Sequence, residues 1–381
     1  MDAVVLSGGA AYGAYEVGVL KALSEKKRFD PEIITGTSVG AFNAAILAGD
    51  SISRLEEVWR EDIPEKGLRG NGVLRIRGNP IPHLASINPM ALFAGVLSDT
   101  ASLTKSAIQR SGAFLTSHGG PSSRLSEFFD VSAFVSCEPL HETIAKTVSL
   151  KRIRESRKQL QIIATDWEAG EARIFHNRDM TEADGESIIL ASAALPGIFP
   201  AVMWRGRALV DGGVVMNTPL KPAIQAGADA IHVISVIPPV SKVEPSELDN
   251  TFEAMIRVLQ IQVGSTIRED AATAGWINAG IEVLEKAKAG DDITPVQLRD
   301  FVRVAEQLRK RAEQGSEFRH VTIHHYHPEG SLGSPLGLLD FTRTNIETLI
   351  DRGFKDASCH ICHDCGCILP PECDKSVSAR L

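Results

Sequence analysis

The stretch PEIITGTSVGAFNAAILAG, residues 31–49, has two halves: an apolar run over 31–38 and a run rich in small residues over 39–49. The apolar first half predicts a buried strand over 31–38. The second half predicts a helix over 39–49 that ends near a glycine. A strand that passes directly into a helix is the repeating unit of α/β folds, so this stretch sets the fold class.

The turn between these two elements carries the pattern G-x-S-x-G, with Ser38 in the middle of GTSVG. A strand before this pattern and a helix after it indicate a nucleophile elbow, which lifts the serine hydroxyl above the sheet. Gly36 and Gly40 would then allow the strand and the helix to approach closely. The plainer alternative is an ordinary strand–helix turn with a serine N-cap, and the context favours the elbow.

The same alternation extends on both sides of this stretch. Val4 to Leu6 predicts a strand and Ala14 to Glu25 a helix, while Ser53 and Glu56 have the spacing of a capping box for the next helix. Strand, helix, strand and helix in this order predict a parallel sheet covered by helices.

The α/β pattern returns after residue 158. Expected strands are 159–166 and 172–177, paired around a turn, then 208–213, 228–237 and an edge strand within 320–328; a closing helix is expected over 342–357. Two stretches interrupt the pattern. Residues 64–125 are rich in Pro, Gly, Ser and Asn and predict an irregular insertion that forms either a lid or a wall of a binding site. Residues 247–314 predict a helical excursion with a capped start at Thr294, Pro295 and Gln297.

The composition argues against a nucleic-acid-binding protein and against a membrane-spanning or secreted one. The chain of 381 residues has a net charge of −8 and 43% hydrophobic residues. The acidic balance argues against nucleic acid as a partner, because phosphate binding requires a basic surface. There is no apolar run of membrane-spanning length and no signal-peptide pattern, so we expect a cytoplasmic protein.

A glycine-rich segment, SGGAAYGAYEVGVL at 7–20, follows the first expected strand. Such turns let backbone N–H groups approach a negative group, either a nucleotide phosphate or the oxyanion of a reacting ester. The nucleotide interpretation is weak, because GGAAYG matches G-x-G-x-x-G poorly and no acidic residue closes the second strand.

A serine nucleophile also needs a base, and DGGVVMNTP at 211–219 offers one. Asp211 follows the apolar run 208–210, so it lies at a strand end, where α/β sites form. Gly212 and Gly213 would allow a sharp turn that leaves the carboxylate facing the site. An ordinary Asp-Gly turn is the alternative.

Taken together, the glycine-rich turn, GTSVG and DGGVVMNTP resemble the patatin-like phospholipase family, and ASAALPGIFPAV at 191–202 resembles the stretch before that family's catalytic aspartate. The resemblance covers residues 1–357 and leaves 358–381 as a Cys- and His-rich tail. It implies a three-layer α/β/α fold with a mainly parallel central sheet.

The resemblance also implies the chemistry. Ser38 would be the nucleophile and Asp211 the base of a dyad without histidine, and the N–H groups around Gly8, Gly9 and Ala10 would form the oxyanion hole. The substrates would be phospholipids, lysophospholipids or other acyl-ester lipids, cleaved through an acyl-enzyme without a metal or cofactor.

Two positions depart from the family pattern G-G-G-x-(Arg or Lys)-G. Ala10 replaces the third glycine and Tyr12 replaces the basic residue. Alanine keeps the N–H but does not readily adopt a positive φ. A lipid-binding protein with impaired catalysis is therefore the alternative function.

Four histidines within the last expected strand segment, 320–328, offer another catalytic arrangement. A triad with His320, His324, His325 or His327 is an alternative to the dyad, and we interpret these histidines as structural. Residues 86–98 carry apolar side chains at helical spacing, which predicts either transient membrane contact or cover for the core.

The tail CHICHDCGCILPPEC has two interpretations, a Zn²⁺ site or a flexible end with incidental thiols. No metal site is assigned to it, because no distant ligand pair is evident.

Overall fold

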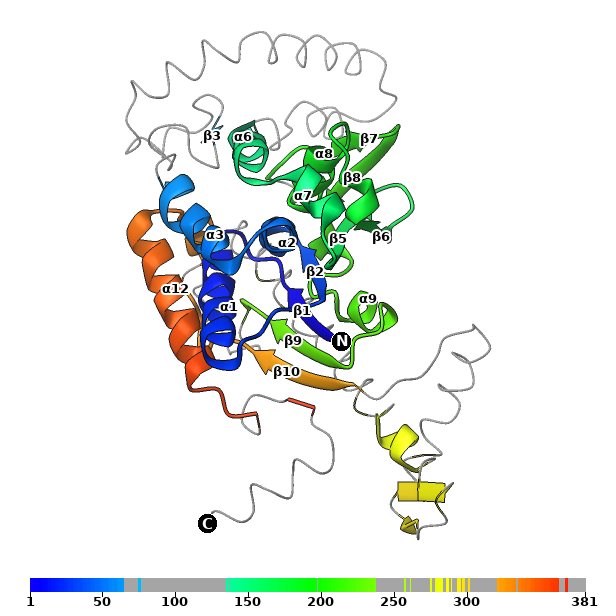
Figure 1. The fold of residues 1–381 in the computed structure, drawn as a ribbon. Helices are drawn as coiled ribbons and strands as arrows, with labels where there is room; N and C mark the ends of the chain where they lie inside the picture. Colours follow the sequence, from blue (N-terminus) through cyan, green and yellow to red (C-terminus); the bar gives the residue numbers. More distant parts are fainter. Residues whose placement is uncertain are drawn as a thin grey trace, which may run out of the picture.

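The structure is a computed structural model of the chain (Figure 1). It describes residues 1–64, 75–76, 135–136, 138–196, 198–237, 321–333, 335–362 and 367–368, with scattered residues between 257 and 301. The predicted lid over 64–125, including the apolar segment 86–98, lies almost entirely outside the described residues, and so does most of the predicted helical excursion.

The described strands form one large sheet with the order β10-β9-β1-β2-β5-β8-β7, and β6 also pairs with β5. Their bounds are β1 Asp2–Leu6, β2 Ile33–Thr37, β5 Gln159–Asp166, β6 Glu171–His176, β7 Val202–Trp204, β8 Arg207–Asp211, β9 Ala230–Ile234 and β10 Thr322–Tyr326. The pairs from β10 to β5 are parallel, whereas β6, β8 and β7 run antiparallel to their partners. A short ribbon, β3 Arg75–Ile76 with β4 Val135–Ser136, is separate.

Helices cover both faces of this sheet. They are α1 Gly13–Lys27, α2 Val39–Gly49, α3 Ile52–Glu57, α6 Glu138–Thr147, α7 Leu150–Glu155, α8 Gly185–Ser192, α9 Leu220–Gln225 and α12 Arg343–Ser358. In Figure 1, α1 and α12 lie side by side on one face near α2, and α9 lies on the other. The predicted three-layer α/β/α architecture is confirmed.

The alternation of side chains along β1 explains the two layers of core. Val4 and Leu6 belong to the large apolar cluster under α1, α2 and α12, while Ala3 and Val5 belong to the smaller cluster under α9. A strand that is buried on both faces reads as a continuous apolar run, which is why the sequence revealed this element.

The position of the site depends on the two edges of β5. β6 pairs with residues 161–166, so it occupies one edge, and β2 and β8 must share the other. β2 pairs with residues 159–163 and β8 continues with 164–166. The C-terminal ends of β2 and β8 therefore meet on the same edge of β5, and Ser38 and Asp211 lie at these two ends.

Most predicted elements are confirmed, including the helix over 39–49, the strand pair around the turn at 168–170, and an edge strand within 320–328. At Thr294 the capping box is present, since Thr294 and Gln297 exchange hydrogen bonds. The predicted cap at Ser53 is wrong. Ser51 is the N-cap of α3 and accepts a hydrogen bond from the N–H of Arg54, because the helix begins at Ile52.

None of the described helices combines the length and the apolar character that a membrane crossing requires.

Candidate active site

Ser38 has the backbone of a strained elbow. Its φ is 57° and its ψ is −125°, a conformation that few non-glycine residues adopt. The N–H of Ser38 donates to Ser192 Oγ at 2.9 Å, and Ser192 Oγ donates in turn to the carbonyl oxygen of Ile163 on β5. Ser192 is fully buried, so this chain of hydrogen bonds fixes the elbow to the neighbouring strand.

The two glycines of the elbow explain how so tight a turn fits. A Cβ on Gly36 would lie 2.2 Å from the carbonyl oxygen of Gly40, and a Cβ on Gly40 would lie 2.5 Å from that of Leu6. Any side chain at these positions would push α2 away from β1 and β2. Glycine here therefore brings the N-terminus of α2, with its positive dipole end, to Ser38.

Asp211 ends β8 and faces Ser38. Its carboxylate accepts hydrogen bonds from the Ser38 hydroxyl and from the N–H of Gly213, the latter at 2.7 Å. Gly212 and Gly213 form a 3-10 turn directly after it. A Cβ on Gly212 would lie 2.3 Å from the carbonyl oxygen of Ile163, so glycine lets this turn close against β5.

Burial controls the charge of this carboxylate. Only 3% of Asp211 is exposed. Loss of hydration raises its pKa from 3.8 to about 6, although the hydrogen bonds from Ser38 and Gly213 partly oppose the rise. A carboxylate with this pKa is ionised at neutral pH and is a stronger base than an exposed aspartate.

The glycine-rich turn after β1 completes the site. The N–H of Gly8 donates to the carbonyl oxygen of Asn217 at 3.3 Å, and Asn217 Nδ2 donates back to the carbonyl oxygen of Gly8 at 3.3 Å. Within the described part of the chain, the N–H groups of Gly9 and Ala10 have no protein acceptor. Of the three predicted donors, these two are the ones available to a ligand.

Ala10 and Tyr12 fit the turn in different ways. Ala10 adopts a positive φ of 48°, the conformation that glycine adopts at lower cost. Tyr12 is 5% exposed, and its hydroxyl lies beside Gly333 and Gly337. Burial raises its pKa to about 12, with a further contribution from Asp340. Tyr12 thus packs against Gly333 and Gly337 and carries no charge.

An apolar cavity of about 150 Å³ opens beside Ser38 and Asp211. Most of its wall is aliphatic or aromatic: Val39, Phe42, Trp59, Ile63, Leu140, Ile144, Ile189, Leu195, Ile198, Phe199, Ile237, Leu338, Leu339 and Phe341. Gly9 and Ala10 also line it. A polar pair at the side of an apolar cavity can bind a long apolar chain and react with a polar group at its end.

A family model described as patatin-like phospholipase matches residues 4–224. This range contains Ser38, Asp211 and the glycine-rich turn. The part of the cavity wall formed by Ile237, Leu338, Leu339 and Phe341 lies beyond it. The chain belongs to the patatin-like phospholipase family. The expected resemblance is therefore confirmed at the level of family and fold.

Individual relatives match shorter stretches. A patatin-like phospholipase domain-containing protein of Cryptococcus neoformans var. neoformans is 42% identical over 65 residues, which are 17% of this chain and 7% of the relative. Lysophospholipase nte1 of Aspergillus terreus is 52% identical over 48 residues, 13% of this chain and 3% of the relative. The matched stretches span less than a tenth of these curated relatives. The solved structure of VipD from Legionella pneumophila is 16% identical and has a TM-score of 0.40, with 93% of this chain and 65% of that chain covered.

Sequence reasoning missed two positioning residues of this patatin-like site, Ser192 and Asn217. Both lie in segments that resembled the family, but a buried serine or asparagine has no local signal that marks its partner. The structure does not form a triad with His324, His325 or His327, and His320 lies outside the described residues. No histidine is among the described residues that line the cavity, and β10, which carries His324 and His325, lies three strands from β2.

Proposed function

We propose that this chain hydrolyses carboxylic esters of phospholipids, lysophospholipids or other acyl lipids, with Ser38 as nucleophile and Asp211 as base. The observation that carries the proposal is the buried Asp211 carboxylate, hydrogen-bonded to a strained serine beside an apolar cavity. Membership of a family named for phospholipases supports the lipid class of substrate.

The reaction follows from this arrangement. Ser38 Oγ attacks the carbonyl carbon of the ester while its proton passes to Asp211, and the N–H groups of Gly9 and Ala10 stabilise the oxyanion. The bond from the carbonyl carbon to the alcohol oxygen then breaks, and Asp211 returns the proton to the leaving alcohol. Water attacks the acyl-enzyme, gives its proton to Asp211, and releases the fatty acid as the proton returns to Ser38 Oγ. The scheme requires no metal or organic cofactor.

The cavity accounts for the acyl group. Side chains from α2, α6 and α8, together with Leu338, Leu339 and Phe341, enclose it, and few of its wall atoms are polar. A hydrocarbon chain in this cavity leaves water at a gain of about 0.8 kcal/mol per buried CH₂ group. We therefore expect turnover to increase with acyl length until the cavity is filled.

Hydrolysis of p-nitrophenyl acyl esters and labelling by a fluorophosphonate test the assignment. Ser38→Ala should abolish labelling and lower kcat/KM by about 10³-fold or more, and Asp211→Asn should slow both labelling and turnover by about 10²-fold or more. In the wild type, kcat/KM should rise with pH through about 6, because only the ionised Asp211 accepts the proton.

Asp166→Asn is the matched control. Asp166 is also a buried carboxylate at a strand end, but it binds Arg207 at 2.8 Å and lies outside the cavity wall. The Asp166→Asn variant should retain wild-type labelling by the fluorophosphonate. Equal labelling of Asp211→Asn and wild type would exclude Asp211 as the base.

A lipid-binding protein with impaired catalysis is the second candidate, because Ala10 is strained and Tyr12 leaves the turn without a cation. It predicts saturable binding of a fatty acid or lysophospholipid with no difference in ester turnover between wild type and Ser38→Ala.

Contact with a membrane surface is a further part of the proposal. Trp167 and Met203 are 59% and 64% exposed. The N–H of Trp167 donates to the carbonyl oxygen of Ala208 on β8, and Met203 on β7 pairs with the same residue, so Trp167 and Met203 lie on either side of β8. Arg205 follows β7 and Arg207 begins β8, and their guanidinium groups pair with Asp184 and Asp166. An exposed aromatic and an exposed aliphatic side chain close together suit the interface of a bilayer.

A further inference from the structure

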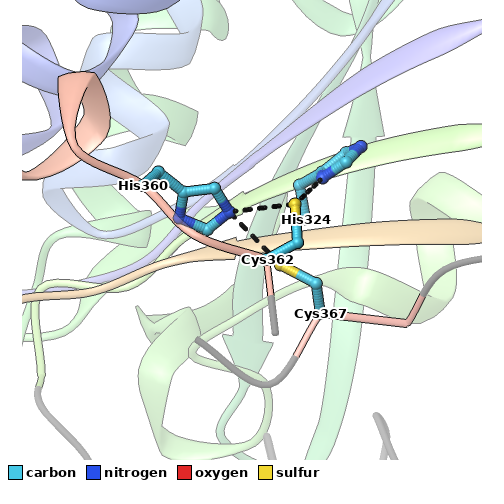
Figure 2. Close-up of side chains that lie close together, drawn as sticks. All are labelled: His324, His360, Cys362 and Cys367. Atoms are coloured by element: carbon cyan, nitrogen blue, oxygen red, sulfur yellow. Dashed lines mark hydrogen bonds between the residues drawn. The ribbon is translucent and has the colours of Figure 1, made fainter. Parts of the chain in front are cut away.

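Four ligand-type side chains from two distant segments converge at the edge of the sheet opposite β7. His324 lies on β10, and His360, Cys362 and Cys367 follow α12 (Figure 2). Their ligand atoms all lie within 4.8 Å of one another. This cluster supplies the distant partner that the sequence of the Cys-rich tail did not reveal.

Three sulfur–nitrogen separations in the cluster are close to the edge of a tetrahedron around zinc. Cys362 Sγ lies 3.4 Å from His324 Nδ1 and 3.6 Å from His360 Nε2, and Cys367 Sγ lies 3.3 Å from His360 Nε2. With Zn–S of about 2.3 Å and Zn–N of about 2.0–2.1 Å at tetrahedral angles, a sulfur and a nitrogen ligand are about 3.6 Å apart. Weak thiol–imidazole hydrogen bonds alone do not explain four groups that converge on one point, since a thiol has a single proton to donate.

The surrounding contacts support and orient the ligands. The N–H of His325 points at Cys367 Sγ at 3.2 Å, and the N–H of Cys367 donates to the carbonyl oxygen of Cys362 at 3.3 Å. The His360 ring packs on Tyr326 with centroids 4.3 Å apart, and the His324 ring stacks on His232 at 4.9 Å. Backbone N–H groups directed at a thiolate sulfur and packed imidazole rings are the outer contacts that hold metal ligands in place.

A metal ion at this point would hold the C-terminal segment against the edge of the sheet. β10 is an edge strand, and an unpaired edge invites pairing with another chain. Ile368 covers it through a single bridge, in which Ile323 and Ile368 exchange two hydrogen bonds of 2.8 Å. Two hydrogen bonds alone hold a terminal segment weakly, whereas a four-coordinate ion joins it covalently to the strand.

We propose that His324, His360, Cys362 and Cys367 bind one Zn²⁺ ion that fastens the C-terminal segment to β10. Two thiolates and two imidazoles are a ligand set that favours zinc, and four protein ligands leave no position for a substrate, so the site is structural. It is separate from Ser38, because β10 lies three strands from β2.

Metal content of the purified full chain, expressed in zinc-supplemented medium, tests the proposal. Elemental analysis should find one zinc per chain in the wild type, and Cys362→Ser and His324→Ala should reduce this to near zero. Cys359→Ser and His327→Ala are matched controls, since both residues lie near the cluster but outside it, and they should retain the ion. Replacement by Co²⁺ should give thiolate-to-metal charge-transfer absorption that is lost in Cys362→Ser.

Fluorophosphonate labelling of Ser38 verifies that each variant is folded, because the site is remote from the cluster. Wild-type protein that takes up no zinc or cobalt under reducing conditions would overturn the proposal, and so would a Cys362–Cys367 disulfide found in that protein. Zinc retained at full stoichiometry in both Cys362→Ser and His324→Ala would overturn it equally.

Discussion

Ala10 shows how one backbone angle bears on this site. Its φ of 48° costs an alanine about 1 kcal/mol relative to glycine. Ala10→Gly should therefore raise the free energy of unfolding by about 0.5–1 kcal/mol, with the oxyanion N–H retained. Urea unfolding measures the change. Ala11→Gly, whose φ is not positive, is the control and should lose stability; a loss in Ala10→Gly as well would show that the strain is not stored there.

The buried Asp211 carboxylate favours catalysis but lowers the stability of the fold at neutral pH. Its pKa is 3.8 when unfolded and about 6 when folded. The folded state therefore holds the proton more tightly, and the contribution of Asp211 to stability falls as pH rises from about 4 to about 6 and stays lost above that. Two pKa units correspond to about 3 kcal/mol.

Asp211→Asn should then stabilise the fold at pH 7.5 by roughly 1–3 kcal/mol, with a smaller gain at pH 4.5, while catalysis is lost. Thermal unfolding at the two pH values measures this difference. A variant that is less stable than wild type at pH 7.5 would show that the ionised carboxylate gains more from Ser38 and Gly213 than its burial costs.

Tyr12 connects two elements at the cavity, the 3-10 turn Ala10–Tyr12 and the 3-10 turn Pro335–Leu339. A guanidinium in its place would be buried beside Gly333 and Gly337 without hydration. Tyr12→Arg should accordingly lower the melting temperature and the turnover of both phospholipid and uncharged esters, whereas Tyr12→Phe should keep most of both. A selective rise in phospholipid turnover for Tyr12→Arg would instead favour the family's cation at this position.

Trp167, directly after β5, and Met203 on β7 form the proposed membrane contact. Changing Trp167 and Met203 together to Asp should weaken binding to anionic vesicles and reduce long-chain turnover by about 10-fold or more, because both side chains are exposed and contribute apolar area. Short-chain turnover and the melting temperature should stay near wild type. Leu298→Asp, at another exposed apolar residue, is the control; vesicle binding unchanged in the double variant would exclude this surface.

At the scale of the whole molecule, the zinc site and the active site lie at different parts of one sheet. Removal of the ion with a chelator should lower the melting temperature by roughly 3–10 °C and speed amide exchange in β10, because Ile368 is no longer held against this edge strand. Hydrolysis of a short-chain ester by the folded protein should stay unchanged. Exchange that accelerates around Ser38 instead would show that the two regions are coupled.

The sequence by itself determined the elements around the site. Buried strands such as β1 and β2 are short apolar runs, the elbow is a local pattern around Ser38, and Asp211 ends an apolar strand. Each of these signals lies within a few residues of chain, because periodicity, turn chemistry and capping are local properties. The cap of α3 was misplaced by two residues for the same reason, since Ser51 and Ser53 are both acceptable N-caps locally.

Only the tertiary structure decided which distant residues meet. Ser38 and Asp211 come together because β2 and β8 share one edge of β5, and Ser192 and Asn217 find their partners through that register. His324 joins the cysteines of the tail because β10 is the edge strand beside which α12 ends. Contacts between residues that lie far apart in the chain depend on strand order and register, and these are set by the packing of the whole sheet rather than by any local pattern.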